Sequence, residues 1–156
     1  MLFTSMFIHG HAPESMVETV LVPVLKNKAG DLSDTNNYRP IALSNVISKL
    51  IEIIILDRCK MQLSTTDYQF GFKQKHATDM CIYVLKEMID YYRAHGSSVY
   101  ICSLDASKAF DKINHSILFA KLINRNVPLH IVRLHGVWYS TQQLSVMWGK
   151  CSSKVF

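Results

Sequence analysis

Acidic residues are missing from the C-terminal part of this 156-residue chain. No Asp or Glu follows Asp111, so a site built on paired carboxylates has no ligand to draw on after that residue. The same part of the chain keeps its basic residues, which are Lys112, Lys121, Arg125, Arg133, Lys150 and Lys154. We therefore interpret it either as a surface that faces a polyanion or as a piece of a larger, charge-balanced protein.

Several other signals are lacking. The four cysteines lie far apart, with no C-x-x-C pair and no Cys/His cluster at zinc-ligand spacing, which favours reduced thiols in the core of an intracellular protein. No apolar run approaches the ~18 residues of a membrane helix. The apolar N-terminus lacks the basic start of a secretory signal. We expect a protein that is neither secreted nor transmembrane.

The composition is that of a core-forming globular protein, with 49% hydrophobic and 19% charged residues and a net charge of +5. β-Branched and apolar runs predict strands at residues 18–25, 98–104 and 144–148. Apolar spacing of i, i+3, i+4 predicts helices at 44–63, with Ser44 as N-cap, and at 78–94, 116–123 and 129–138. The fold class is α+β, since strands and helices do not alternate regularly.

The segment from Ser103 to His115 is the most informative part of the chain. It sets Asp105 at the C-terminal end of the apolar run 98–104, and Asp111 follows six residues later. A carboxylate held at a strand end can bind Mg²⁺ together with substrate phosphates. The alternative is structural, because Asp is also common as the cap of a turn or helix. Local spacing leaves both interpretations open.

Four segments follow one another in the chain: LVPVLKNKAG, NYRPIALSNVISKLIE, YQFGFKQKHAT and SLDASKAFDKINHSIL. In this order they make the chain resemble the reverse transcriptase domain of non-LTR (LINE-like) retrotransposons. The first three are similar to the fingers motifs of that family, and the last is similar to motif A of its palm. The resemblance implies a partial right-hand polymerase, with fingers, an incomplete palm and a small antiparallel sheet. About 1–97 would be fingers and connecting helices, and about 98–156 partial palm, within one truncated domain.

The resemblance also implies roles for residues of the last segment. Asp105 would be a catalytic ligand of a pair of Mg²⁺ ions. Phe110 would be a steric gate that clashes with a ribose 2′-OH and so favours deoxynucleotides; the competing interpretation is an ordinary core aromatic. The backbone amides of Lys108 and Ala109 would face the triphosphate. Asp111 would support the turn by hydrogen bonding and would not ligate metal.

Residues of the fingers segments acquire roles in the same way. Arg39 and Lys26 or Lys28 would grip the triphosphate, Arg in a bidentate manner and Lys as a point charge. Gly71, Phe72 and Lys73 would lie near the template and the templating base pair. For each lysine the alternative is a solvated surface charge, and for Gly71 it is a plain turn. The place of Gly71 between two Phe residues suits a tight loop in which a side chain would obstruct something.

The resemblance stops short of a complete catalytic centre. The Q-G segment and the Y-x-D-D turn of the family are absent from this sequence. The chain therefore lacks the paired aspartates that would hold the metal ions together with Asp105. We expect a fragment of an RNA-directed DNA polymerase that is inactive alone and binds Mg²⁺ weakly at most. Its partners would be an RNA template, a DNA primer and dNTPs, in the nucleus or cytoplasm and away from membranes; the sequence does not indicate an oligomeric state. The alternatives are a non-catalytic RNA or RNA–DNA binding module and a non-functional retrotransposon remnant.

Overall fold

The computed structural model describes all 156 residues and divides them into two compact units. The first unit comprises Met1–Gln62 and His115–Phe156, and the second comprises Leu63–Asn114. Each unit is described by itself. The boundary near residue 97 that separates fingers from palm by resemblance is a different division and stays a prediction.

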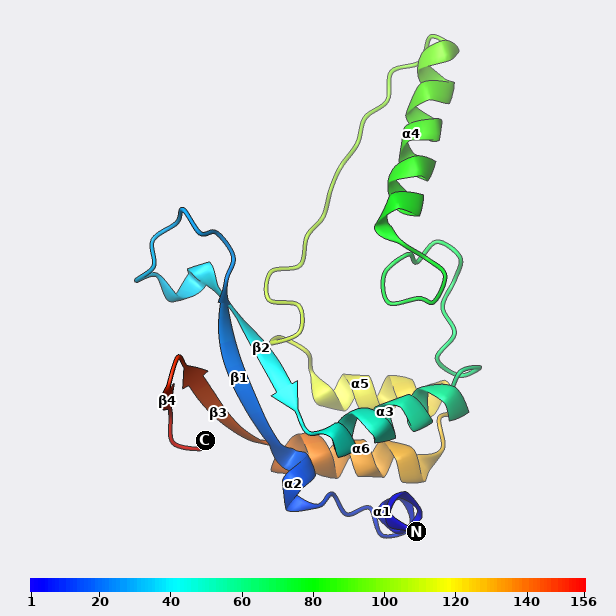
Figure 1. Cartoon of the computed structure of the whole chain (residues 1–156). Coiled ribbons are helices and arrows are strands. Elements are labelled where there is room, and N and C mark those ends of the chain that lie inside the picture. The colour runs from blue at the N-terminus through cyan, green and yellow to red at the C-terminus, as the bar shows by residue number, and fades with distance from the viewer. The chain divides into compact units, whose positions relative to one another are not determined.

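A four-stranded sheet forms one end of the first unit (Figure 1). Its strands are β1 (Glu18–Leu25), β2 (Tyr38–Ser44), β3 (Gln143–Trp148) and β4 (Cys151–Ser152), in the order β2-β1-β3-β4. β1 pairs antiparallel with β2, and β3 pairs antiparallel with β4. β1 and β3 pair in parallel, so the sheet is mixed and the prediction of an antiparallel sheet is wrong at this pairing. A parallel pair needs a long crossover, and here the chain between β1 and β3 includes helices of both units.

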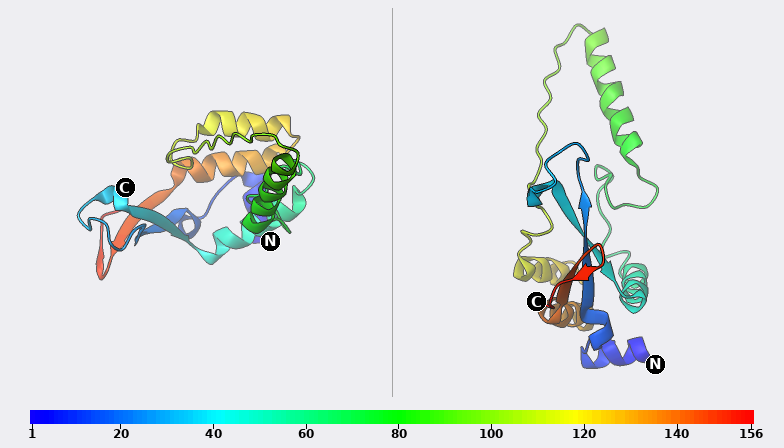
Figure 2. Two further views of the ribbon diagram at one scale, coloured as in Figure 1. Left: turned by 90° about the horizontal axis from the view of Figure 1, so that it is seen from above. Right: turned by 60° about the vertical axis from the view of Figure 1, so that its left-hand side comes forward.

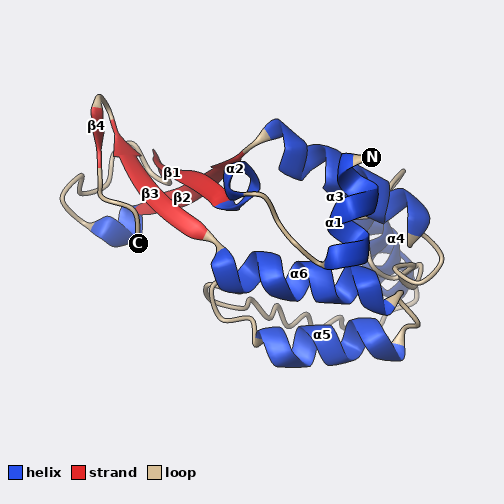
Figure 3. Ribbon diagram, turned by 90° about the horizontal axis from the view of Figure 1, so that it is seen from below, coloured by secondary structure: helices blue, strands red, loops and turns tan.

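The other end of the first unit is helical (Figure 3). Its helices are α1 (Leu2–His9), α2 (Glu14–Val17), α3 (Val46–Arg58), α5 (His115–Asn124) and α6 (Leu129–Thr141), with a 3₁₀ turn at Thr35–Asn37. α5 and α6 run side by side in Figures 1 and 2. The most deeply buried side chains are Met16, Ser48, Ile51, Cys59 and Leu134. The core of this unit therefore joins the start of β1 to α3 and α6.

α3 differs from the prediction at both ends: its N-cap lies one residue later, and it ends at Arg58 instead of near Leu63. Asn45 is the N-cap, and its side chain accepts a hydrogen bond of 3.0 Å from the amide of Ile47. Ser44 is the last residue of β2, where its backbone pairs with Thr19. The buried Ser48 hydroxyl then donates to the carbonyl oxygen of Met16 at 3.1 Å, which ties α3 to the segment before β1.

The second unit contains one helix, α4 (Thr78–Ala94), with loops on either side. The helix ends as predicted, near His95 and Gly96, and Gly96 adopts a left-handed φ of 73°. The predicted strand at 98–104 is wrong, because these residues form no ladder and are exposed. A strand is stabilised by pairing with a neighbour, and the second unit contains no other strand that could supply one.

The remaining sequence predictions have mixed outcomes. The predicted helices near 78–94, 116–123 and 129–138 and the strands near 18–25 and 144–148 are confirmed. All four cysteines are free, but only Cys59 is a core thiol, and burial raises the pKa of its thiol. Cys81, Cys102 and Cys151 are exposed, which corrects that part of the prediction. None of the helices has the length and apolar character needed to span a membrane.

Candidate nucleotide and template site

The first group of predicted site residues lies at one end of the β1–β2 hairpin. Lys26 follows the last residue of β1, Lys28 lies in the connecting loop, and Arg39 is the second residue of β2, paired with Val24. All three basic side chains are exposed. The hairpin register therefore brings these cations to the same end of the sheet.

Side-chain hydrogen bonds hold the hairpin loop in shape. The side-chain nitrogen Nδ2 of Asn37 donates to the carbonyl oxygens of Asn27 and Asp31, at 3.0 and 3.1 Å. A Cβ on Gly30 would lie 2.9 Å from that nitrogen, so the close approach favours glycine. The ammonium group of Lys26 donates to the carbonyl oxygen of Asn36 at 2.7 Å. This hydrogen bond fixes the Lys26 side chain over the loop.

The second group lies in the second unit, and its first members are in the loop before α4. Phe72 has a left-handed φ of 56°, which is rare for a bulky residue, and its side chain is 96% exposed. No atom of the chain lies within 4 Å of a Cβ built on Gly71, so nothing within the chain would be obstructed by a side chain there. The unusual backbone conformation belongs to Phe72 and not to the glycine.

Lys73 is held by an ion pair that the sequence analysis did not single out. Its ammonium group lies 2.9 Å from an Asp67 carboxylate oxygen and also donates to the carbonyl oxygen of Thr66 at 3.1 Å. The hydrogen bond and the charge of Lys73 lower the pKa of the exposed Asp67 carboxyl. A carboxylate six residues before a lysine in one loop is the sequence signal that could have indicated this pair.

Asp105 lies in an irregular, exposed stretch and not at the end of a strand. The turn after it is closed by a backbone hydrogen bond of 3.2 Å from the Lys112 amide to the Lys108 carbonyl oxygen, and Lys108 has a left-handed φ of 52°. This hydrogen bond runs between backbone atoms, and the supporting role of Asp111 stays a prediction. Ala109 lies within the same turn and is also exposed.

The structure brings Phe110 and Phe72 together within the second unit. Their ring centroids are 6.1 Å apart and the ring planes meet at 86°, which is an edge-to-face contact. Phe110 is still 73% exposed, so it is not the ordinary core aromatic that was the alternative for this residue. The predicted sugar gate and a predicted template residue are therefore neighbours.

The chain does not assemble a complete metal site. It contains no group of three or more His, Cys, Asp or Glu side chains that could hold a metal ion. A pair of Mg²⁺ ions needs several oxygen ligands, and Asp105 supplies one carboxylate. The donors present therefore do not fit a two-metal centre.

Comparison with protein families accounts for this set of motifs. The family model described as "Reverse transcriptase (RNA-dependent DNA polymerase)" matches residues 24–153, which include every predicted site residue. The chain belongs to the reverse transcriptase family. As a family, reverse transcriptases are metal-dependent, although this chain shows no metal ligand set of its own.

Individual relatives confirm the resemblance to non-LTR retrotransposons. The chain is 29% identical over 111 residues to the "Retrovirus-related Pol polyprotein from type-1 retrotransposable element R2" of Popillia japonica, covering 70% of this chain and 15% of that protein. It is 26% identical over 163 aligned positions to the "RNA-directed DNA polymerase from mobile element jockey" of Drosophila funebris, covering 99% of this chain and 17% of that protein. The chain thus spans less than a fifth of the length of these relatives, and it corresponds to part of a reverse transcriptase domain.

Proposed function

We propose that this chain supplies the fingers and the first catalytic carboxylate for RNA-directed DNA synthesis. The family match over residues 24–153 carries the proposal, because it includes the ordered motifs that end in Asp105 and Phe110. The reaction would transfer a deoxynucleotide from a dNTP to a primer 3′-OH, directed by an RNA template. The alternative of a binding module unrelated to polymerisation is not favoured by the polymerase relatives.

Within each unit, we assign a role in nucleotide recognition to that unit's own site residues. Arg39, Lys26 and Lys28 would bind the triphosphate, since guanidinium and ammonium groups form strong charge-assisted hydrogen bonds to phosphate. The exposed ring of Phe110 would exclude a ribose 2′-OH by steric contact. The amides of Lys108 and Ala109 would donate to phosphate oxygens from a turn that leaves them accessible.

The template side would use Gly71, Phe72 and Lys73. Open space around Gly71 leaves room for a nucleic-acid backbone, and the exposed Phe72 ring offers a surface on which a base can stack. Lys73 would have to exchange its contact with Asp67 for a phosphate. Such an exchange costs little, because the Asp67 carboxylate is fully exposed and water screens the ion pair.

Asp105 is proposed as a Mg²⁺ ligand, and this single carboxylate limits what the chain does alone. A polymerase centre of this kind needs two ions held by more than one carboxylate, and no Asp or Glu follows Asp111. The 156-residue chain alone is therefore expected to bind template and primer without extending the primer.

A primer-extension assay tests both parts of the proposal. The chain is incubated with a labelled DNA primer on an RNA template, dNTPs and Mg²⁺, and binding and extension are measured in parallel. We expect a hybrid complex whose association constant falls as salt rises, because basic residues displace counterions from phosphates. Extension should not exceed that of an Asp105→Ala control. Absence of a salt-dependent complex contradicts the assignment of the fingers, and extension above the control contradicts the incomplete centre.

A further inference from the structure

A cavity of about 560 Å³ lies in the first unit, between α1, α3 and α6. Its volume is within the range of small-molecule sites. None of the residues assigned above to dNTP, template or metal takes part in it. The lining residues are Met1, Phe3, Thr4, Phe7, Ile8, Ile54, Arg58, His130 and Arg133.

The ionisable side chains that line the cavity are all basic. Arg58 comes from the last turn of α3, and His130 and Arg133 come from the first turns of α6. No lining residue is acidic, and the ion pair of Lys73 with Asp67 lies in the other unit. The Arg58 guanidinium has no hydrogen-bond or ion-pair partner in the structure. It is therefore a cation without a counter-charge at a cavity wall.

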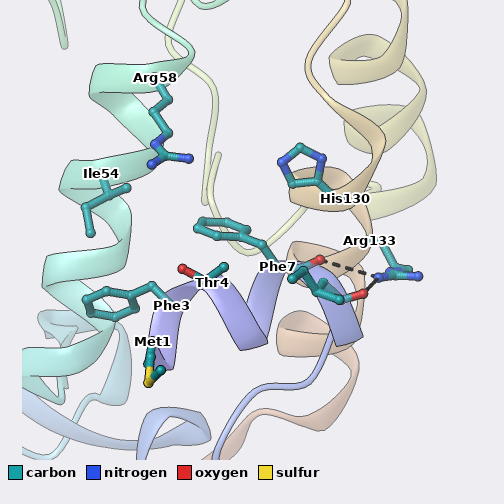
Figure 4. Close-up of a pocket in the computed structure, with 9 residues that line it drawn as sticks. Met1, Phe3, Thr4, Phe7, Ile54, Arg58, His130 and Arg133 are labelled. Atoms are coloured by element: carbon teal, nitrogen blue, oxygen red, sulfur yellow. Dashed lines mark hydrogen bonds between the residues drawn. The ribbon is translucent and has the colours of Figure 1, made fainter.

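Arg133 is partly used by the fold. Its Nη2 donates to the carbonyl oxygens of Phe7 and Ile8, at the C-terminal end of α1 (Figure 4). A guanidinium group carries five N–H donors, so further donors remain after these two contacts. The arginine thus fixes α1 and still contributes positive charge to the cavity.

The start of α6 adds to the same positive potential. α6 begins at Leu129 after Pro128, and no side chain caps its first amides. The N-terminal end of a helix of this length carries a partial positive charge that favours an anion. His130 lies in that first turn, next to the cavity.

The rest of the wall is apolar and aromatic. In Figure 4, Arg58 and His130 lie on either side of the Phe7 ring, and the Phe3 ring lies towards α3 near Ile54. Phe7 is held edge-to-face against His130, with ring centroids 5.8 Å apart and planes at 82°. The ring of Phe7 is therefore fixed in place before any ligand binds, which reduces the entropy cost of binding.

We propose that this cavity is a second nucleotide site, which binds a phosphate beside an aromatic base. Arg58 and the basic first turn of α6 would bind the phosphate, and Phe3 with the fixed Phe7 ring would contact the base. The phosphate and base could belong to a free mononucleotide or to one nucleotide of a single strand, which share this chemistry. The site goes beyond the proposed polymerase role and does not depend on Asp105 or on a metal ion.

The test is calorimetric titration of the full chain in EDTA, so that no metal-dependent binding contributes. The probes are AMP, inorganic phosphate, adenosine and octa-adenylate RNA. AMP is expected to bind more tightly than either phosphate or adenosine. Arg58→Gln should weaken AMP binding about tenfold, the usual effect of removing one charge-assisted contact. Phe3→Leu should weaken it about fivefold through lost stacking.

Arg93→Gln is the matched control, because Arg93 occupies the last turn of α4 as Arg58 does in α3, but lies outside the cavity. It should leave AMP affinity unchanged. The proposal is overturned if AMP binds no more tightly than phosphate, or if Arg58→Gln has no larger effect than Arg93→Gln. Tighter binding of octa-adenylate than of AMP, with the same sensitivity to Arg58→Gln, identifies the ligand as a strand; equal affinities identify a mononucleotide.

Discussion

Two isoleucines on α3 provide a direct test of how the first unit is packed. Ile51 is fully buried, whereas Ile53, two residues further along the same helix, is 63% exposed. Substituting each with Ala removes the same atoms from the same helix. The two variants therefore differ in burial alone, and each serves as the control for the other.

The magnitudes follow from the burial. Ile51→Ala removes a fully buried side chain and leaves a cavity, which should lower the free energy of unfolding by about 2–5 kcal/mol. Ile53→Ala loses only a minor part of that burial, and the higher helix propensity of Ala offsets some of the loss. We expect a decrease below about 1 kcal/mol for this variant.

Urea unfolding followed by tryptophan fluorescence measures both values. Trp138 and Trp148 are the only tryptophans and both lie in the first unit, so the signal reports that unit and not the second. Trp138 is buried in α6 and should change its emission when the core opens. Equal losses for the two variants, or a loss below about 1 kcal/mol for Ile51→Ala, would refute the packing of α3 described above.

Three further predictions concern single groups. Gly10→Ala should lower the free energy of unfolding by about 1 kcal/mol or more. Gly10 has a φ of 64°, and a Cβ at this position would lie 2.6 Å from Arg133 Nε. Urea titration measures the loss. By NMR titration, Lys73→Met should raise the lowered pKa of Asp67 towards that of a free carboxyl. In the native chain, the stabilisation from this ion pair is fully present above the unfolded-state pKa of Asp67. It should be lost as the pH falls through the lowered folded-state pKa of Asp67. If the pKa of Asp67 is the same in the Lys73→Met variant as in the native chain, the ion pair is contradicted. In native protein a thiol reagent should leave Cys59 unmodified until urea is added, while it modifies the exposed thiols, which are Cys81, Cys102 and Cys151.

Local sequence patterns predicted most of the regular elements. α4 follows from apolar spacing and a glycine stop, and β1 follows from its β-branched run. These features depend on residues close together in the chain, which is why they can be inferred from the sequence. The irregular conformation of 98–104 could not be inferred in this way. An apolar run becomes a strand only where another strand pairs with it.

The candidate site shows the same division. The sequence indicated Asp105 and Phe110 through their motif, and family comparison supports that motif without testing the role of either residue. The contact of Phe110 with Phe72 and the ion pair of Lys73 with Asp67 depend on loop conformations that no periodicity encodes. The cavity of Arg58, His130 and Arg133 likewise joins three helices from distant parts of the chain.

The sequence by itself determined the family and the α+β class. Motif order and the lack of acids after Asp111 are properties of the chain and need no folding to be read. Tertiary structure decided the parallel pairing of β1 with β3, the irregular conformation around Asp105 and the cluster of cations beside Phe7. The physical reason is that pairing, burial and charge clustering are relations between distant residues, which exist only once the chain has packed.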